Sequence, residues 1–455
     1  MRRAVRSGNT GWCLGFAVAA FVCLWLPGLC HAQFAYQSSA VGGVSINPDG
    51  LLENATIDAM GTLRAERLKM SEPVPAELKA ATTLRKISLR RLEKAIAESF
   101  EEEKPLSDEM RYLAGLQRIE YVFVYPEQGD IVLAGHGAGW TVDERGTIVG
   151  TDTGRPVLLL DDLLVALRTA RGSAQQGISC SIDPTAEGLN RLRALVSGLK
   201  TIGNPSQTIS AIQDTLGLQT ITVRGVPDTT HFARVLVAAD FRMKRIAMAF
   251  EPSPVRGLPS FLEMVGTTGR GMNNMLPRWW LTPNFEPLLR DADGLAWKFQ
   301  STSVKAMAED DFLKDSGERE RTGKASAIAQ RWADNMTKAY PELAVADPVF
   351  GQLQNCMELA VVGALVVREN LTEKANYSFP LLMENGDLDT VAFDAPSKVR
   401  SQASVLRKGT KWIISASGGV EIPSFAIAGS QEPTNSIYPV REKAENQTPQ
   451  HWWWN

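Results

Sequence analysis

The sequence predicts an α+β fold, because strand-like and helical hydrophobic patterns occur both in separate runs and in alternation. Short strand-like segments follow one another over residues 118–149. Strands and helices alternate over 178–250, and apolar residues recur at helical spacing over 325–367. We therefore expect a mixed-sheet N-terminal unit, an α/β middle unit of βαβ type with a β-meander, and a C-terminal part that is helical and then β.

Composition divides the chain into several expected segments. They are a signal peptide at 1–32, a flexible lead-in with a short helix at 33–83, an α+β unit at 84–172, an α/β unit with a β-meander at 173–310, a helical and then β unit at 311–430, and a disordered, Trp-ended tail at 431–455. A chain of 455 residues is long enough for two or three compact units.

The start of the chain has the layout of a secretory signal peptide. Arg2, Arg3 and Arg6 precede an apolar run over 12–29, and Ala32 supplies the small residue before a cleavage site. A retained membrane anchor and a lipoprotein signal are the alternatives. Because the run would barely span a bilayer and a polar stretch follows it, we expect cleavage, export to the periplasm or the outside, and no stable transmembrane anchor afterwards.

N-terminal sequencing of the mature protein is expected to begin at Gln33 or within a few residues of it. The reason is the order of the charged, apolar and small-residue regions, which is the order that export requires. A full-length chain recovered from the cytoplasm would contradict this expectation.

The charge balance argues against a nucleic-acid partner. The formal net charge is −3 at pH 7, and the predicted leader contains three arginines and no acidic residue, so the mature chain is more acidic still. Such a chain lacks the basic footprint that binds nucleic acid or an anionic membrane surface.

Two cysteines, Cys180 and Cys356, lie outside the predicted leader. A disulfide between them is one alternative in an oxidising compartment. Cys180 alternates with Ile178 and Ile182 in a strand-like run, whereas Cys356 lies in an apolar helix. Two separately buried thiols are the simpler interpretation.

The N-terminal unit begins with helices capped by serine. Ser88 is expected to cap a helix that ends near residue 100, and Ser107 one that ends at Leu116. Residues 118–125 are apolar on both faces, which predicts a central strand. The other elements expected here are a short helix at 56–70, antiparallel strands at 130–134, 140–142 and 147–149, and a helix from the capping residue Asp161 to Arg171.

The middle unit has a βαβ rhythm. Strand 219–224, helix 230–241 and strand 245–250 are expected to form a parallel, right-handed crossover. A strand at 178–182 and two helices precede it, the first opened by Asp183 as N-cap and by Pro184. A long loop at 251–277 and a meander at 279–282, 288–290 and 295–299 are expected to follow it.

The C-terminal part starts with two helices. Apolar spacing predicts a helix over 325–336, and Asp347 with Pro348 is a typical start for a second helix through Val367, apolar enough to be buried. Strands are expected at 377–383, 399–406 and 411–415. The polar composition from Gln431 onward predicts disorder, so that removing 431–455 would leave the melting temperature within about 2 °C.

The segment Gly135-His136-Gly137-Ala138-Gly139-Trp140 is the best local candidate for chemistry. Alternating glycines after a strand bring backbone amides close to an anion, and His136 would serve as acid, base or ligand. However, the spacing is not that of a dinucleotide fingerprint or a phosphate loop. A hairpin that needs glycine geometry is the simpler interpretation, so His136 is a weak catalytic candidate.

Neither a metal site nor a cofactor is predicted. The histidines outside the leader are His136, His231 and His451, and none forms a zinc-binding motif with the separate cysteines. His231 is expected in the first turn of its helix, at the surface. Acidic pairs such as Asp161-Asp162 are more simply explained by caps and turns than by calcium binding.

Tryptophans are the binding candidates. Trp279 and Trp280 are adjacent on a predicted strand, so one indole can enter the core while the other faces a groove or partner. A structural role for both is the alternative. Trp452, Trp453 and Trp454 end the predicted disordered tail, where exposed indoles favour docking onto a protein partner or an envelope surface.

Three segments carry a family resemblance: YVFVYPEQGDIVLAGHGAGW at 121–140, HFARVLVAADFRMKRIA at 231–247, and PRWW at 277–280. They resemble a family of exported bacterial proteins defined only as domain of unknown function 1598, over most of residues 84–420. The resemblance implies a secreted protein with no assigned reaction, cofactor or catalytic residue. It also implies that a histidine is not required at position 136.

These observations favour a non-catalytic envelope or extracellular protein that binds a partner or has a structural role in organising the envelope. The alternative is an uncharacterised hydrolase that acts on envelope or extracellular polymers. A cleft that joins His136 to two carboxylates would favour the enzyme, whereas an aromatic surface near Trp279 and an ordered tail would favour binding.

Overall fold

The computed structural model describes residues 40–47, 49–55, 61–198, 204–268, 277–313, 319–321, 325–384, 386–404, 406–408, 411–413, 417–446 and 453–454. All described elements belong to the unit Ser39–Asn455. The predicted leader, its cleavage site, Trp452 and His451 lie outside the described residues. The class is α+β, as predicted.

A nine-stranded mixed sheet has the order β1-β2-β15-β9-β8-β18-β10-β13-β14. Most neighbours are antiparallel, but β10 with β18 and β15 with β2 are parallel. Its strands are β1 Val44–Ile46, β2 Leu51–Asn54, β8 Ile178–Pro184, β9 Leu218–Arg224, β10 Pro277–Phe285, β13 Thr302–Leu313, β14 Arg319–Arg321, β15 Lys398–Arg400 and β18 Ser417–Ile422.

A six-stranded sheet has the order β19-β11-β12-β4-β5-β3. Its strands are β3 Thr82–Ser88, β4 Tyr121–Tyr125, β5 Asp130–Gly137, β11 Leu288–Asp291, β12 Ala296–Lys298 and β19 Gln431–Thr434. The predicted central position of residues 118–125 is confirmed, because β4 lies between β12 and β5. The expected antiparallel pairing of 140–142 with 147–149 is confirmed in β6 Trp140–Val142 and β7 Ile148–Gly150, but these two strands form a sheet of their own, whereas β5 pairs with β3 and β4.

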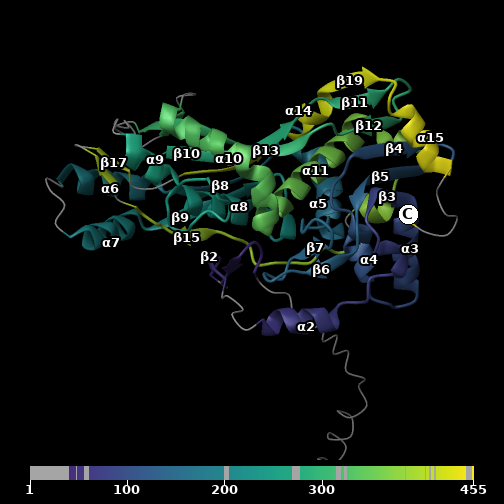
Figure 1. The fold of residues 1–455 in the computed structure, drawn as a ribbon, viewed down its shortest axis with the longest axis horizontal. Coiled ribbons are helices and arrows are strands. Elements are labelled where there is room, and N and C mark those ends of the chain that lie inside the picture. The colour runs from purple at the N-terminus through teal and green to yellow at the C-terminus, as the bar shows by residue number, and fades with distance from the viewer. Residues whose placement is uncertain are drawn as a thin grey trace, which may run out of the picture. The chain divides into compact units, whose positions relative to one another are not determined.

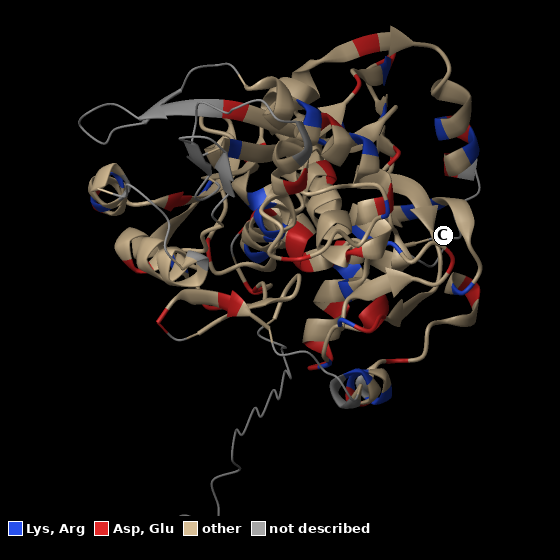
Figure 2. Ribbon diagram, turned by 60° about the vertical axis from the view of Figure 1, so that its left-hand side comes forward, with Lys and Arg blue, Asp and Glu red and all other residues tan. Residues whose placement is uncertain are grey.

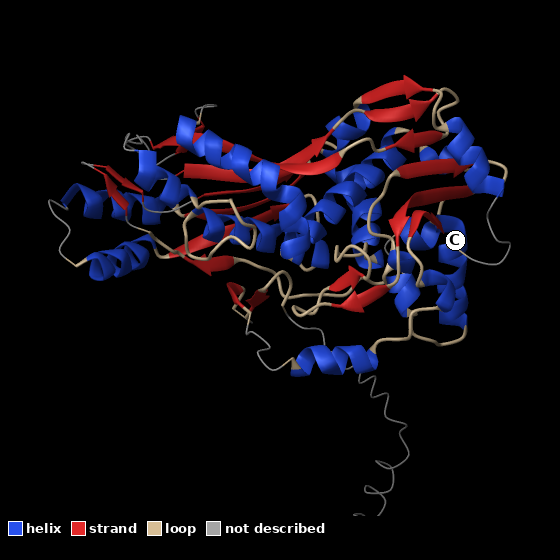
Figure 3. Ribbon diagram, in the orientation of Figure 1, coloured by secondary structure: helices blue, strands red, loops and turns tan. Residues whose placement is uncertain are grey.

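Helices pack against and around these sheets (Figures 1 and 3). They are α2 Thr62–Met70, α3 Leu89–Glu101, α4 Asp108–Arg111, α5 Leu160–Ser173, α6 Ala186–Gly198, α7 Pro205–Leu216, α8 His231–Ala247, α9 Phe261–Thr268, α10 Ala327–Ala346, α11 Pro348–Arg368, α12 Leu371–Lys374, α13 Pro380–Met383, α14 Ser424–Gly429 and α15 Tyr438–Asn446. Short 3-10 turns lie at Ala76–Leu78 and Leu113–Gly115, and a further strand pair is β16 Leu406–Lys408 with β17 Lys411–Ile413.

The helix α11 is the centre of the core. It packs against α5, α8, α10 and α14. Its length and composition would also suit a membrane span, but 94% of its most apolar window is buried inside the protein, which is the environment of a core helix. The predicted start of this helix is confirmed, with Asp347 at the N-cap and Pro348 in the first turn.

Side-chain caps fix several helix starts. The Ser88 hydroxyl accepts from the Arg91 amide at 3.1 Å, as expected from the sequence. Thr230 and Ser326 cap α8 and α10 in the same way. The carboxylate of Asp347, although at the N-cap, instead forms ion pairs with Arg145 and Arg242.

The predicted parallel crossover is wrong. Residues 245–247 continue α8, and β8 and β9 are antiparallel neighbours. The apolar run at 246–250 suggested a strand. In the helix, Lys244 pairs with Asp240 one turn earlier and Arg245 pairs with Glu251 just beyond the helix end. Helix contacts therefore outweigh the local pattern.

Other local expectations also need correction. Asp183 and Pro184 end β8, and the Thr185 hydroxyl accepts from the Gly188 amide at the start of α6 instead. Asp161 lies inside the first turn of α5 rather than at its cap. The strand expected at 377–383 is replaced by the short helix α13, and α9 occupies part of the expected 251–277 loop.

Cys180 and Cys356 are both free and buried, as the simpler interpretation predicted. Burial raises the pKa of each thiol well above its ordinary value. Both sulfurs therefore remain protonated and behave as core groups.

The predicted disorder of the tail is wrong for the described residues 431–446 and 453–454. β19 pairs in parallel with β11 at one edge of the six-stranded sheet, and α15 then packs against the face of that sheet (Figure 1). Tyr125 and Lys86 donate hydrogen bonds to the carbonyl groups of Arg441 and Ala444 in α15, at 3.0 and 2.8 Å. The segment is thus held by groups that the sheet provides.

The two described tail tryptophans lie at the opposite edge of that sheet. Trp454 forms a β-bridge with Ile87 of β3, and the Trp453 carbonyl accepts from the Ser88 amide at 2.7 Å. Only 3% of Trp453 and 9% of Trp454 is exposed. Both indoles therefore pack onto the protein itself and are not free for docking.

Candidate functional site

A groove lies across the outer face of the nine-stranded sheet, on strands β9, β8, β18, β10 and β13. It has a volume of about 450 Å³. We call it the sheet-face groove, and it is lined by Gln176, Ser179, Cys180, Ser181, Asp183, Thr222, Arg224, Arg278, Trp280, Glu309, Gly419, Val420 and Glu421. The volume falls in the range of small-molecule sites.

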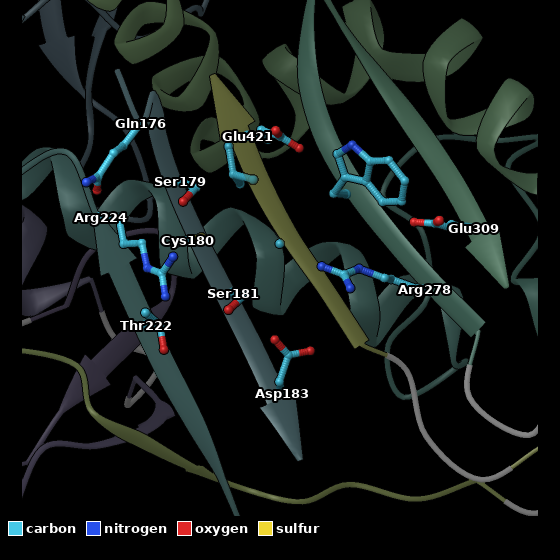
Figure 4. A pocket seen from close by; sticks show the side chains of 13 residues that line it. Gln176, Ser179, Cys180, Ser181, Asp183, Thr222, Arg224, Arg278, Glu309 and Glu421 are labelled. Atoms are coloured by element: carbon cyan, nitrogen blue, oxygen red, sulfur yellow. The ribbon is translucent and has the colours of Figure 1, made fainter. Parts of the chain in front are cut away.

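Because side chains alternate along each strand, one set of residues faces the core and the other set faces the groove. In β8, Ile178, Cys180 and Ile182 are buried toward α8, while Ser179, Ser181 and Asp183 alternate with them on the other face. Figure 4 shows the last three in a row along their strand, beside Thr222 and Arg224 of the neighbouring strand. The alternation predicts the groove-facing positions of each strand once the pairing is known.

Pairing brings distant segments into single rows across the groove. One row, which we call the middle row, runs from Thr222 through Ser181 and Gly419 to Trp280. A second row joins Arg224, Ser179 and Glu421.

At one end of the groove, Arg278 faces Glu309 across the β10–β13 pair. The Arg278 guanidinium also lies 5.9 Å from the centre of the Trp280 ring. The site thus combines cations, carboxylates, hydroxyls and one aromatic ring.

Two glycines shape the middle of the groove. Gly418 has φ 133°, and a Cβ there would lie 1.5 Å from the Trp279 carbonyl oxygen. A Cβ on Gly419 would lie 1.8 Å from the Cys180 carbonyl oxygen. Strand β18 can therefore fit between β8 and β10 only with glycine at both positions, and Gly419 leaves the floor without a side chain.

A buried ion pair supports this floor from below. The Lys244 ammonium contacts Asp240 at 2.8 Å and donates to the carbonyls of Ile182 and Gly418 at 3.0 and 3.2 Å. Burial raises the pKa of Asp240 to about 6, although Lys244 acts in the opposite direction. The pair ties β8 and β18 to α8.

The adjacent tryptophans lie on opposite faces of their strand, as the sequence analysis allowed. Trp279 is 0% exposed and packs against Phe261 and Trp332, with ring centres 4.8 Å apart in both cases. Trp280 lines the groove. Trp279 is therefore a core residue, and Trp280 is the one of the pair that stays available to a ligand.

His136 lies elsewhere, on β5 of the six-stranded sheet. Its Nε2 is 2.6 Å from Asp152, whose other oxygen accepts from Gln117 at 2.8 Å. Burial acts to raise the pKa of Asp152, but hydrogen bonds from Gln117 and His136 outweigh it and hold the pKa below its usual value. The pair orients an imidazole, yet the recorded contacts of this ring in the described chain include no nucleophile.

The glycines beside His136 serve close packing. A Cβ on Gly135 would lie 2.2 Å from the Arg118 carbonyl oxygen, and one on Gly137 would lie 2.7 Å from Cβ of Arg85. Neither residue has a positive φ. The expected hairpin with special glycine geometry is thus replaced by a strand end that neighbouring chain segments approach closely.

A third titratable cluster is buried among α5, α8 and α11. The Nδ1 atom of His231 lies 3.0 Å from both oxygens of Asp162, and its side chain is 11% exposed, so the expected surface position is wrong. Asp162 also contacts the protonated Cys356 thiol. Since the carboxylate lies between the two, the arrangement does not activate the sulfur.

The replacement His231→Gln is expected to destabilise the protein by about 1.5–3 kcal/mol at pH 6, the value of a hydrogen bond to a charged group. Burial lowers the pKa of His231, but the charge and hydrogen bond of Asp162, with help from Asp161, raise it overall. A raised folded-state pKa gives a contribution that is complete below about pH 6.5 and is lost as pH rises through the folded pKa. Urea unfolding from pH 5 to 9 should show a flatter profile in the variant, and equal slopes would contradict the assignment.

No group of three or more His, Cys, Asp or Glu side chains is placed to hold a metal ion among the residues that the structure describes. Acidic and basic residues are interspersed over the elements seen in Figure 2. The sheet-face groove is therefore the arrangement best suited to binding, through direct polar contacts and one aromatic ring.

Five of the thirteen residues that line the groove, with the helix beneath it, lie in a recognisable family segment. Residues 180–261 match the family described as protein of unknown function (DUF1598). The DUF1598 segment contains Ser181, Asp183, Thr222 and Arg224 and the quoted string 231–247, whereas the strings at 121–140 and 277–280 lie outside it. No curated protein and no solved structure matches the chain.

Proposed function

We propose that this protein is exported and acts as a non-catalytic binding protein of the envelope or extracellular space, with a polar ligand held in the sheet-face groove. The observation that carries the proposal is the lining of that groove, where hydroxyls, guanidinium groups and carboxylates from five strands surround a hollow of about 450 Å³. Export rests on the N-terminal pattern of arginines, apolar residues and Ala32.

A hydrolase is the alternative, and the pair of His136 and Asp152 is the observation that speaks for it. His136 lies on a different sheet from the groove, and Asp152 lies in the turn after β7. The contacts of this pair are those of a histidine held in place by a carboxylate. Binding without turnover is therefore the better proposal for the groove.

The replacement Ser181→Phe is expected to block the groove without unfolding the protein. Ser181 lies in the middle row, beside the side-chain-free Gly419, so a phenyl ring there would fill the hollow and not the core. Thr220→Phe is the matched control, because Thr220 is exposed on the same face of β9 but does not line the groove.

Thermal unfolding with a panel of oligosaccharides, tripeptides, nucleotides and inorganic phosphate tests the proposal. At least one class is expected to stabilise the wild type and Thr220→Phe, by about 2.7 kcal/mol at a hundredfold excess over Kd, but not Ser181→Phe. A shift that persists in Ser181→Phe, no shift with any class, or conversion of a probe into products would overturn the proposal.

A further inference from the structure

Six polar side chains of the sheet-face groove present unused donors and acceptors side by side. Gln176, Ser179, Ser181, Thr222, Arg224 and Glu421 make no side-chain hydrogen bond or ion pair to other described residues. Arg224 offers only donors and Glu421 only acceptors, whereas each hydroxyl and amide offers both. A ligand that satisfies this set must itself donate and accept at closely spaced points.

Simple ions do not meet this requirement. A phosphate or other anion would meet the donors of Arg224 but would also face Asp183, Glu309 and Glu421. A cation would meet those carboxylates but would face Arg224 and Arg278. A neutral molecule rich in hydroxyl groups avoids both conflicts, because a hydroxyl accepts from a guanidinium and donates to a carboxylate.

An extended peptide also fits poorly. The backbone groups of β8, β18 and β10 are already paired with one another under the groove, so a peptide cannot add to this face as a further strand. Recognition must come from the side chains. The short Ser181 and the bare Gly419 leave room for a ring to lie flat beside Trp280.

The middle row has the dimensions and the aromatic surface for an oligomer of rings. From Thr222 to Trp280 it crosses three strand spacings, or about 14 Å. The apolar face of a sugar ring packs on an indole, while its equatorial hydroxyls point sideways to polar groups.

We propose that the ligand of the sheet-face groove is a carbohydrate chain, with one sugar ring stacked on Trp280 and neighbouring hydroxyls bound by Arg224 and Glu421. The inference rests on the proposed function and narrows its ligand class. It makes Trp280 the apolar anchor and the row of Arg224, Ser179 and Glu421 the polar side of the site.

The test is a glycan array of bacterial and plant oligosaccharides, followed by calorimetry with the best-bound soluble oligosaccharide. Trp280→Ala is expected to weaken binding at least about tenfold, since stacked aromatic anchors dominate such sites. Trp280→Phe should recover most of that loss, and Glu421→Gln should weaken binding without changing the melting temperature. Thr220→Phe is the control that should bind as the wild type does.

The outcomes separate this inference from the proposed function. Glycan binding that is lost in Ser181→Phe and Trp280→Ala, and kept in Thr220→Phe, supports both. If no glycan binds but tripeptides or phosphate bind and Ser181→Phe removes that binding, the inference of a carbohydrate ligand is overturned. The proposal that the groove is a binding site then stands. Glycan binding that no groove substitution changes overturns the inference, and the absence of any groove-dependent ligand overturns both.

Discussion

Replacing both Trp453 and Trp454 by alanine is expected to lower the free energy of unfolding by about 5 kcal/mol or more, since a buried Trp→Ala change costs about 3–5 kcal/mol. Both indoles are buried, at 3% and 9% exposed, against the β3 edge of the six-stranded sheet. Such a loss is comparable with the whole stability of a typical domain, about 5–15 kcal/mol. Urea unfolding followed by circular dichroism would measure it.

Removing residues 431–455 is expected to lower the free energy of unfolding by more than the double tryptophan substitution does. The deletion takes away β19 at one sheet edge, α15 on the sheet face and the tryptophan pair at the other edge. Tyr438→Ala is the control, because Tyr438 is 49% exposed on the same segment and its contact with Arg441 is worth about 0.5–1 kcal/mol. A truncated protein that melts within about 2 °C of the full chain would restore the disordered-tail hypothesis.

The tail shows why sequence alone misleads about a segment of this kind. Residues 431–446 are mostly polar, and the three apolar residues at helical spacing, Ile437, Val440 and Ala444, make a stripe too short to outweigh that composition. Their partners are supplied by Phe123, Tyr125 and Val132 of the sheet. Composition indicates how much apolar surface a segment can bury by itself. It does not indicate which apolar surface another part of the chain provides for the segment to pack against.

Elements whose signals are local were predictable. The helix α11 carries a Pro start signal and is apolar around its circumference, and β4 is apolar on both faces. Period two was sufficient to separate Trp279 from Trp280, because neighbouring strand residues face opposite sides. In each case the deciding information lies within a few residues of the element.

The sheet-face groove was not predictable in the same way. Its rows join residues 179–183, 222–224, 278–280 and 419–421, and the order of these strands depends on pairing over long sequence separations. The sequence contains a signal at Gly418 and Gly419, where adjacent glycines in a strand indicate close backbone approach. That signal identifies a strand whose backbone is approached closely by its neighbours, but it does not identify which strands those neighbours are.

Glu358→Gln is the point substitution expected to destabilise the core most. Glu358 is 0% exposed on α11, and its carboxylate accepts from Arg118 Nε at 2.7 Å and from the Ile119 amide at 2.9 Å. Arg118 also donates to the Thr302 carbonyl at 2.7 Å. One carboxylate thus connects the central helix to the segment that leads into β4 and, through Arg118, to the start of β13.

The expected cost is about 3–5 kcal/mol, because a glutamine places an amide donor among donors and leaves a guanidinium without its counter-charge. The double variant Arg118→Met/Glu358→Leu should be less destabilised than the sum of its single changes. It should not reach wild-type stability, since an unpaired Ile119 amide still costs about 1–3 kcal/mol. Glu342→Gln, at an exposed position of α10, is the control. Equilibrium unfolding of the wild type, Arg118→Met, Glu358→Leu and the double variant completes the cycle. A Glu358→Gln protein within about 1 kcal/mol of the wild type would show that α11 is held by apolar packing alone.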